Sequence, residues 1–216
     1  MSGHLVLFDL DRTLVRDSSL ATVARVAFRY RLLSPWRMAV ALARNARYAR
    51  TGEQGDIAGW ARDTVLSTIA GRPVDELHTV VDESIERLVP KVRPSMRRAL
   101  DGHLAAGDRC VVLSASPHEL VDGLARRLGA ERGVGTRGEI VDGRCTGRLV
   151  GPFCHGQGKL ARLRVEIGPF ELGEATCYTD SASDLPLLEA VRRPVVVCPD
   201  DRLRQLATER GWRISE

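Results

Sequence analysis

The sequence predicts an α/β protein in which helices cover both faces of a parallel sheet and one purely helical segment is inserted. Three observations predict it. Short apolar runs alternate with helix-length stretches along most of the 216 residues. Each apolar run is followed by a polar or acidic group. Residues 18–89 break the alternation with a helical pattern alone. A sheet wound in this way is Rossmann-like.

Four apolar runs are the predicted strands: Leu5–Phe8, Cys110–Leu113, Ala175–Tyr178 and Val195–Cys198. A continuous apolar run is typical of a strand that is buried on both faces. In open α/β sheets, ligands bind beyond the carboxyl ends of the parallel strands. We therefore expect Asp9, Ser114 and Asp180, which follow three of these strands, to lie close together.

Helix-length stretches with start or stop signals lie between and after the strands. They are Pro94–Ala106, Pro117–Leu128, Gly158–Glu166, Leu185–Val191 and Arg202–Arg210. Within residues 133–153, Asp142-Gly143 between β-tolerant flanks predicts a short hairpin. We assign residues 1–17 and 90–216 to a sheet core and residues 18–89 to a helical cap.

Composition excludes several classes of protein. With 44% hydrophobic and 28% charged residues the chain can bury a core and is not of the disordered type. The sequence contains no run of 18 apolar residues, so it predicts no membrane span. The first residues lack the pattern of a secretory signal, so we expect a cytoplasmic protein. The five cysteines are odd in number and form no CxxC pair, which disfavours a disulfide framework and a structural zinc site.

Positive charge is concentrated in one part of the predicted cap. Between Ser18 and Gly52 there are seven arginines and no acid: Arg25, Arg29, Arg31, Arg37, Arg44, Arg47 and Arg50. Such a segment is a solvated helix face, or it attracts an acidic substrate, an anionic membrane surface or nucleic acid. We expect no stable nucleic-acid partner and leave peripheral membrane contact open. The sequence does not set the oligomeric state.

Two acids end the first strand. Alternation along an extended chain points the carboxylates of Asp9 and Asp11 in the same direction. Like charges so close repel one another, and burial strengthens the repulsion. A divalent cation with oxygen ligands is the simplest compensation, and Asp180 and Asp184 would complete its site. Ser114 and Lys159 supply a hydroxyl and a cation that suit an anion.

Four motifs occur in order along the chain: Phe8–Val15 (FDLDRTLV), Ser114–Pro117 (SASP), Lys159 and Thr179–Pro186 (TDSASDLP). Together they resemble the motifs of the haloacid dehalogenase (HAD) superfamily, most closely its phosphoserine-phosphatase-like branch (subfamily IB). The resemblance implies a Rossmann-like catalytic core with a helical cap. It also implies Mg²⁺-dependent hydrolysis of a small phosphomonoester through an aspartyl-phosphate intermediate.

The resemblance also implies a role for each motif residue. Asp9 would be the nucleophile, and Asp11 would protonate the leaving alcohol and then deprotonate the attacking water. The Mg²⁺ ligands would be Asp9, the backbone carbonyl of Asp11, and Asp180, with Asp184 close by. The groups that hold the phosphoryl oxygens would be Thr13, Ser114, the Ala115 amide and Lys159. Arg62 is a loose match for the cap arginine that meets a substrate carboxylate.

The sequence departs from phosphoserine phosphatases where they select their substrate. Those enzymes carry a cap Glu for the substrate's ammonium group, whereas this chain has Ser18-Ser19 and no acid before Glu53. Ala115 and Ser183 replace a Gly and an Asn of that branch. We therefore expect L-phosphoserine to be a poorer substrate than a more anionic or more apolar phosphomonoester, such as a sugar phosphate or a lysophospholipid.

Other functions are weighed against hydrolysis. A dehalogenase lacks the second acid of the first motif, because a halide leaves without a proton, so Asp11 argues against that chemistry. Transfer of the phosphoryl group to an acceptor other than water stays open. A non-catalytic binding or regulatory module of the same fold is the alternative from another class.

Overall fold

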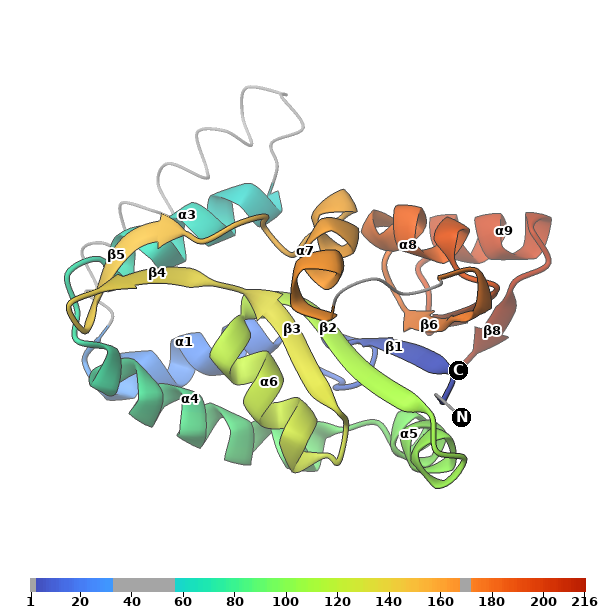
Figure 1. Cartoon of the computed structure of the whole chain (residues 1–216), viewed down its shortest axis with the longest axis horizontal. Coiled ribbons are helices and arrows are strands. Elements are labelled where there is room, and N and C mark those ends of the chain that lie inside the picture. The colour runs from blue at the N-terminus through green and yellow to red at the C-terminus, as the bar shows by residue number, and fades with distance from the viewer. Residues whose placement is uncertain (1–2, 33–56, 168–171) are drawn as a thin grey trace.

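The computed structural model describes residues 3–32, 57–167 and 172–216. Its strands are β1 (Leu5–Asp9), β2 (Arg109–Pro117), β3 (Arg132–Thr136), β4 (Gly138–Val141), β5 (Arg144–Leu149), β6 (Thr176–Thr179), β7 (Arg193–Val197) and β8 (Arg213–Ser215). Six of them form one sheet in the order β3-β2-β1-β6-β7-β8, and every neighbouring pair in it is parallel (Figure 1). The predicted parallel α/β architecture is confirmed.

The two edge strands of this sheet were not predicted from the sequence. The four predicted runs correspond to β1, β2, β6 and β7, whereas β3 and β8 lack a continuous apolar run. Strand β3 contains Gly133, and a Cβ placed there would come within 2.3 Å of the Val121 backbone. The close packing of helix α6 on β3 therefore depends on a residue that carries no hydrophobic signal.

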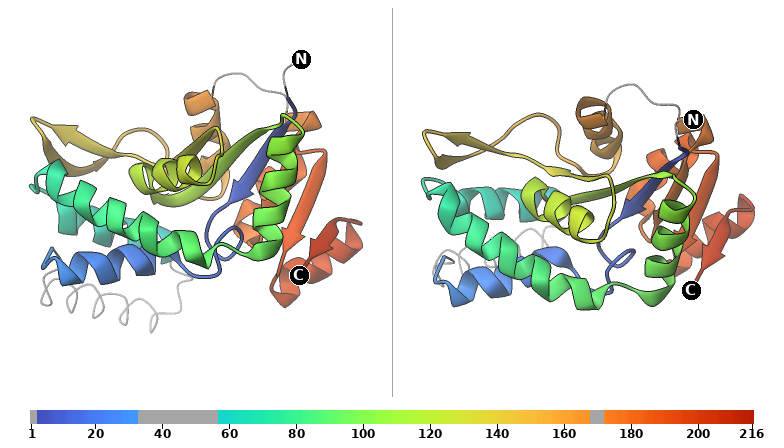
Figure 2. Two further views of the ribbon diagram at one scale, coloured as in Figure 1. Left: turned by 90° about the horizontal axis from the view of Figure 1, so that it is seen from below. Right: turned by 60° about the horizontal axis from the view of Figure 1, so that its bottom comes forward.

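Eight helices of the described chain are placed as follows: α1 (Ser19–Arg29), α3 (Ile57–Ile69), α4 (Val74–Leu88), α5 (Pro94–Ala105), α6 (His118–Arg127), α7 (Gln157–Ile167), α8 (Leu185–Ala190) and α9 (Asp201–Glu209). The five helices that were predicted outside the cap correspond to α5 through α9, with ends that differ by at most one residue. Helices α5 and α6 lie on one side of the sheet and α7, α8 and α9 on the other (Figure 2).

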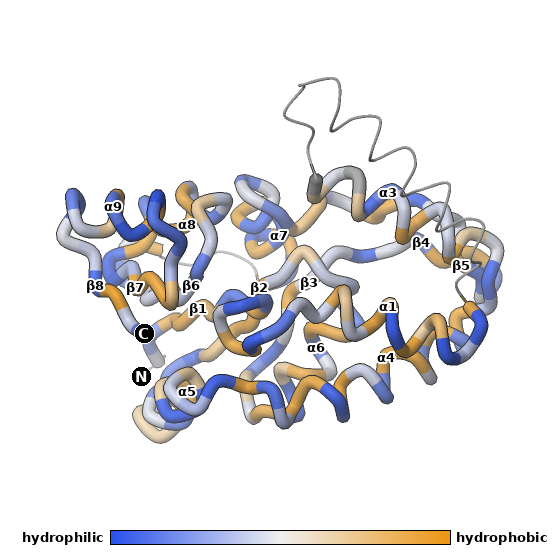
Figure 3. Tube along the Cα trace, turned by 180° about the vertical axis from the view of Figure 1, so that it is seen from behind, coloured by the Kyte–Doolittle hydropathy of each residue, from blue (hydrophilic) through white to orange (hydrophobic). Residues whose placement is uncertain are grey.

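The alternation of side chains along the central strand explains the two layers. On β1, Val6 and Phe8 pack with residues of α5 and α6, whereas Leu5 and Leu7 pack with residues of α7 and α8. Because successive strand residues point to opposite faces, an unbroken apolar run fills both cores. Hydrophobic residues accordingly follow β1 along much of its length (Figure 3).

The described part of residues 18–89 forms α1, α3 and α4. Helix α1 begins with a side-chain cap from Ser18, and α3 and α4 are separated at Gly71-Arg72-Pro73, where a break was expected. The other expected breaks, at Ser34-Pro35 and Gly52–Gly55, lie outside the described residues. No helix of the described chain is long and apolar enough to cross a membrane.

The predicted hairpin forms from β4 and β5, which pair antiparallel. It is bound to the segment between α3 and α4: the Gly71 amide donates to the Cys145 carbonyl at 2.7 Å, and the Val74 amide donates to the Gly143 carbonyl at 2.9 Å. In Figure 1 the hairpin extends from the end of β3 and lies alongside α3. Although it comes late in the sequence, it therefore packs with the inserted helices.

The arginine-rich segment is only partly covered by the structure. Arg25 and Arg29 lie on α1 and Arg31 follows it, whereas Arg37, Arg44, Arg47 and Arg50 lie outside the described residues. The guanidinium of Arg29 forms an ion pair with Glu83 of α4. At least one charge of this segment is thus compensated by an acid on another helix, which the local sequence could not reveal.

Candidate active site

The turn after β1 presents the two acids of the first motif. It is closed by backbone hydrogen bonds from Leu14 to the Asp9 carbonyl, at 3.2 Å, and from Val15 to the Leu10 carbonyl, at 3.0 Å. Arg12 has a φ of 59°, in the left-handed region that few residues other than glycine adopt. The chain reverses sharply there, so that Asp9 and Asp11 both stay at the carboxyl end of the sheet, as expected.

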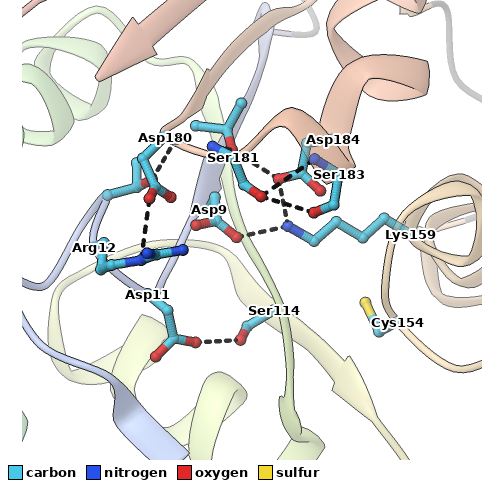
Figure 4. A network of polar contacts seen from close by, with 12 residues as sticks. Asp9, Asp11, Arg12, Ser114, Cys154, Lys159, Asp180, Ser181, Ser183 and Asp184 are labelled. Carbon is cyan, nitrogen blue, oxygen red and sulfur yellow. Dashed lines mark hydrogen bonds and ion pairs between the residues drawn. The ribbon is translucent and has the colours of Figure 1, made fainter. Parts of the chain in front are cut away.

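Asp9, Lys159 and Asp184 form a buried triad, although they are 150 and 25 residues apart in the sequence. The Lys159 ammonium donates to Asp9 Oδ1 and to Asp184 Oδ2, both at 2.6 Å. Figure 4 shows Lys159 reaching from α7 to the two carboxylates. Three elements, β1, α7 and the turn after β6, therefore meet at one ammonium group.

Burial dominates the electrostatics of this triad. It raises the pKa of Asp9 to about 7; Lys159 opposes this rise, and the Asp184 and Asp11 charges add to it. Burial by itself would lower the pKa of Lys159, but the Asp184 and Asp9 charges outweigh it and raise that pKa well above its usual value. The ammonium therefore stays charged and holds the two acids together.

Asp184 is fully buried and has one oxygen without a hydrogen bond. Its Oδ2 accepts from Lys159 and from the Thr179 hydroxyl at 2.7 Å. Its Oδ1 has no partner among the described residues. An unpartnered carboxylate oxygen is costly in a buried site. A cation with oxygen ligands would satisfy it.

Asp180, at the carboxyl end of β6, is held by the turn after β1. Its Oδ1 accepts from the Thr13 hydroxyl at 3.0 Å, and its amide donates to the same hydroxyl at 2.9 Å. Arg12 Nε lies 3.2 Å from its Oδ2. Burial raises the pKa of Asp180, while Arg12 and Thr13 oppose the rise. The Thr13 hydroxyl was expected to hold a phosphoryl oxygen, but here it is occupied with Asp180.

Asp11 connects the sheet to helix α1. Its Oδ2 accepts from the Ser114 hydroxyl at 3.0 Å, and its Oδ1 accepts from the backbone amide of Ser19, the first residue of α1. The Ser19 hydroxyl lies 2.6 Å from that of Ser116. The motifs that contain Asp11 and Ser114 therefore meet at the carboxyl end of the sheet, and Ser19 of α1 joins them.

Two further predicted residues lie on different elements. Ala115 follows Ser114 on β2, in the stretch between Leu113 and Pro117 where the pairing with β3 shifts in register. Arg62 lies on α3, where it forms an ion pair with Asp63 and its guanidinium lies 5.1 Å from the centre of the Phe153 ring. These contacts join α3 to the segment that leads into Lys159, and the role of Arg62 in binding a substrate stays a prediction.

Four residues of the site were not assigned a role from the sequence: Arg12, Ser19, Ser116 and Thr179. Arg12 and Thr179 each stand next to a motif acid, which is a signal that could have been used. Ser19 and Ser116 are ordinary serines in the sequence, and only the docking of α1 on the carboxyl end of β2 joins them.

The carboxylates at the carboxyl end of the sheet are candidate ligands for a divalent cation. Within the described residues, no three His, Cys, Asp or Glu side chains are already close enough to hold a metal ion. The chemistry nevertheless fits a hard cation, because Asp9, Asp180 and Asp184 supply carboxylate oxygens and one Asp184 oxygen has no partner. In Figure 4 Asp180 and Asp184 lie on either side of Asp9.

The sequence profile of haloacid dehalogenase-like hydrolases matches residues 6–189. The chain belongs to this family. Among its relatives in the HAD family, "Phosphoserine phosphatase SerB1" of Mycobacterium tuberculosis (strain H37Rv) is 37% identical over 97% of this chain and 69% of the relative. "Histidinol-phosphatase" of Neisseria meningitidis serogroup C (strain 8013) is 30% identical over 98% of this chain and 97% of the relative.

A crystal structure also matches this HAD protein over its whole length. It is a protein of unknown function from Bordetella pertussis Tohama I, with a TM-score of 0.85, 30% identity, and coverage of 100% of this chain and 99% of that one. Together with the family match, the relatives identify the chain as an enzyme of the phosphatase type.

Proposed function

We propose that this HAD phosphatase hydrolyses a small phosphomonoester through a phosphorylated Asp9. The observation that carries the proposal is the placement of Asp9 at the end of β1, with Oδ1 bound by Lys159 and no hydrogen bond from the described residues to Oδ2. The ammonium fixes the carboxylate in one orientation, and Oδ2 is left to attack phosphorus. The phosphorus–oxygen bond to the leaving alcohol then breaks as the aspartyl phosphate forms.

Asp11 is the acid and base of the proposal. It protonates the leaving alkoxide, and it later takes a proton from the water that hydrolyses the aspartyl phosphate. Its hydrogen bonds from the Ser114 hydroxyl and the Ser19 amide orient the carboxyl group. Ser114, the Ala115 amide and Lys159 would hold the phosphoryl oxygens, which supplies the positioning on which phosphoryl transfer depends.

Mg²⁺ would be held by Asp9, Asp180 and the backbone carbonyl of Asp11, with Asp184 close by. When bound, the ion neutralises the charge that otherwise keeps a carboxylate from approaching a phosphate. Lys159, which is itself bound to Asp184, holds Asp9 in place, and Arg12 and Thr13 do the same for Asp180.

For the substrate we propose a phosphomonoester more anionic or more apolar than L-phosphoserine, with sugar phosphates and lysophospholipids as the classes to test. Ser19, whose hydroxyl meets Ser116, stands beside Asp11 where an acid would be needed to meet an ammonium group. Asp63, another acid of the cap, is already paired with Arg62. The two named relatives carry different substrates in their names, so the family alone does not select one.

We further propose that residues 1–17 and 90–216 act as the catalytic core and residues 18–89 as a cap that excludes water before attack. The backbone bonds between the hairpin and the α3–α4 connection favour movement of β4 and β5 together with the cap. The cytoplasmic location and the peripheral membrane contact stay predictions.

The test combines turnover with chemical trapping. We expect phosphate release from p-nitrophenyl phosphate with Mg²⁺ and its loss in a chelator. After rapid acid quenching, mass spectrometry should find a phosphoryl group on the peptide that contains Asp9, and none in Asp9→Asn. A panel of phosphomonoesters compared by kcat/KM then ranks the substrates. A chain without turnover on any of them would be the non-catalytic module, and turnover without a labelled Asp9 would contradict the covalent mechanism.

A further inference from the structure

A polar cavity lies at the opposite end of the sheet from Asp9. It has a volume of about 770 Å³, and its lining includes Thr176 at the start of β6, Arg193 at the start of β7 and Arg213 at the start of β8. The strands are parallel, so their amino ends lie at the edge of the sheet away from the proposed catalytic residues. In Figure 1 this part of the sheet lies near both chain termini. The volume is within the range of small-molecule sites, roughly 300–1,000 Å³.

The pairing of the strands gathers the polar side chains on one face. Thr176 and Tyr178 of β6 lie opposite Arg193 and Val195 of β7, and Val195 lies opposite Arg213 of β8. Laterally paired residues point to the same face, and so do residues two apart on a strand. Arg193 and Arg213 therefore flank Val195 on the face that also carries the Tyr178 hydroxyl. The other face of β7 and β8 is packed against α8 and α9.

These two arginines have no acidic partner. The Arg193 side chain has a single polar contact, at 3.5 Å, with the His4 ring, and the Arg213 side chain has no hydrogen-bond or ion-pair partner within the described chain. Both are exposed. By contrast, most other arginines of the described surface are paired with an acid; Arg109, for example, makes two hydrogen bonds to Glu131.

Positive charge dominates the rest of the lining as well. Arg192 and Arg210 contribute two further guanidinium groups, and Glu189 is the one acid among the lining residues. Glu189 is paired with Arg210, whose guanidinium also lies 5.1 Å from the centre of the Trp212 ring. Arg192 is paired with Glu174, which is not part of the lining. The cavity thus has an excess of cations, and two of them have no counter-charge.

We propose that this cavity is a binding site for a small polyanion, a molecule with at least two phosphate or carboxylate groups, distinct from the substrate of the catalytic site. Arg193 and Arg213 would each bind one anionic group through charge-assisted hydrogen bonds, which are the strongest that these side chains make. The cavity is larger than one phosphate needs, which favours a molecule with several anionic groups. Tyr178, whose hydroxyl bonds to His103 at 3.1 Å, also lines the cavity.

The test compares two double variants with the same change in net charge. Arg193→Gln/Arg213→Gln removes both unpaired guanidinium groups. Arg98→Gln/Arg202→Gln removes two exposed arginines outside the lining and serves as the matched control. Binding of pyrophosphate and of citrate is measured by isothermal titration calorimetry without Mg²⁺ at two salt concentrations. Thermal unfolding of each variant verifies the fold, and turnover of p-nitrophenyl phosphate verifies the catalytic site.

We expect the wild-type chain to bind at least one probe, and the cavity variant to bind it about 30-fold more weakly, because two charge-assisted contacts are lost. The control should bind as the wild type does, and both variants should keep wild-type turnover. The probe that is bound identifies the anionic group, phosphate or carboxylate. Three results would overturn the proposal: no binding of either probe, equal weakening in both variants, or unchanged binding in the cavity variant.

Discussion

The two ends of the sheet carry charges of opposite sign, which differ in burial and in compensation. At the carboxyl ends, acidic side chains are buried and compensated: Asp9 and Asp184 share the ammonium of Lys159. At the amino ends, Arg193 and Arg213 are exposed and have no acidic partner in the described chain. A buried charge must be paired or neutralised, whereas water can solvate an exposed one. We therefore expect the loss of a charged partner to destabilise the carboxyl end, and the loss of an exposed arginine to have little effect at the amino end.

The largest contrast is in catalysis. Asp9→Asn should reduce turnover by more than about a thousandfold, because the amide is not a nucleophile that can form the phosphorylated intermediate. Arg213→Gln, at the other end of the sheet, should leave turnover unchanged. The measurement is kcat on p-nitrophenyl phosphate, with circular dichroism to verify folding. Wild-type activity in Asp9→Asn would remove Asp9 from the mechanism.

The next contrast is in stability. Lys159→Met leaves two buried carboxylates without their cation and should lower the free energy of unfolding by about 3–5 kcal/mol. Arg213→Met should change it by less than about 0.5 kcal/mol. Urea unfolding at pH 7 measures both. If Lys159→Met does not fold, the double variant Lys159→Met/Asp184→Asn should recover part of the loss, because one buried charge is gone.

A smaller effect on catalysis distinguishes Asp11 from Asp9. Asp11→Asn should lower kcat/KM on an alkyl phosphate by about a hundredfold or more, because an alkoxide is a poor leaving group without a proton donor. On p-nitrophenyl phosphate, whose phenolate leaves readily, the loss should be clearly smaller. Equal losses on the two esters would contradict the role of Asp11 as the acid.

The smallest contrast concerns pH. Arg137 makes hydrogen bonds of 2.7 and 3.0 Å to Glu166 and lowers the pKa of that carboxyl group below its usual value of 4.5. A lowered folded-state pKa stabilises the fold above the unfolded pKa, and this stabilisation is lost as the pH falls through the folded pKa. Glu166→Gln should therefore cost about 1 kcal/mol at pH 7 and much less near pH 3.

The control for this prediction is the exposed pair between Glu174 and Arg192 at the amino end of the sheet. Glu174→Gln should have no measurable effect on unfolding at either pH, since exposed ion pairs contribute little. Urea unfolding of both variants at the two pH values tests the contrast. A loss at pH 3 as large as that at pH 7 would show that the Glu166 side chain acts through packing instead of charge.

Much of the fold was predictable from local patterns. Leu5–Phe8 is apolar at every position, and the structure buries its side chains on both faces of β1. Strands β3 and β8 were not predicted. Glycines interrupt the sequence of β3, and β8 (Arg213–Ser215) is too short to show an apolar pattern. They pair only because β2 and β7 present an open edge to them.

For the site, the sequence predicted which residues lie close together. It predicted few of the hydrogen-bond partners of each residue. Asp9, Lys159 and Asp184 were all expected at the carboxyl end, but the sharing of one ammonium by two acids was not. The Thr13 hydroxyl was expected on a phosphoryl group, and the structure binds it to Asp180. The choice of hydrogen-bond partner depends on differences of a few tenths of an ångström in the distance between side chains. These side chains lie on elements that are far apart in the sequence.

The amino-acid sequence was sufficient to predict the strands that bear the acids and the edge of the sheet where those acids lie. It could do so because strand alternation and the direction of parallel strands are local properties that each segment carries. The packing of distant segments sets which charges are compensated. It also places the hairpin of residues 138–149 on the inserted helices and brings Arg193 and Arg213 to one cavity. Compensation and burial are set by the side chains that folding brings close, and no single segment of the chain contains that information.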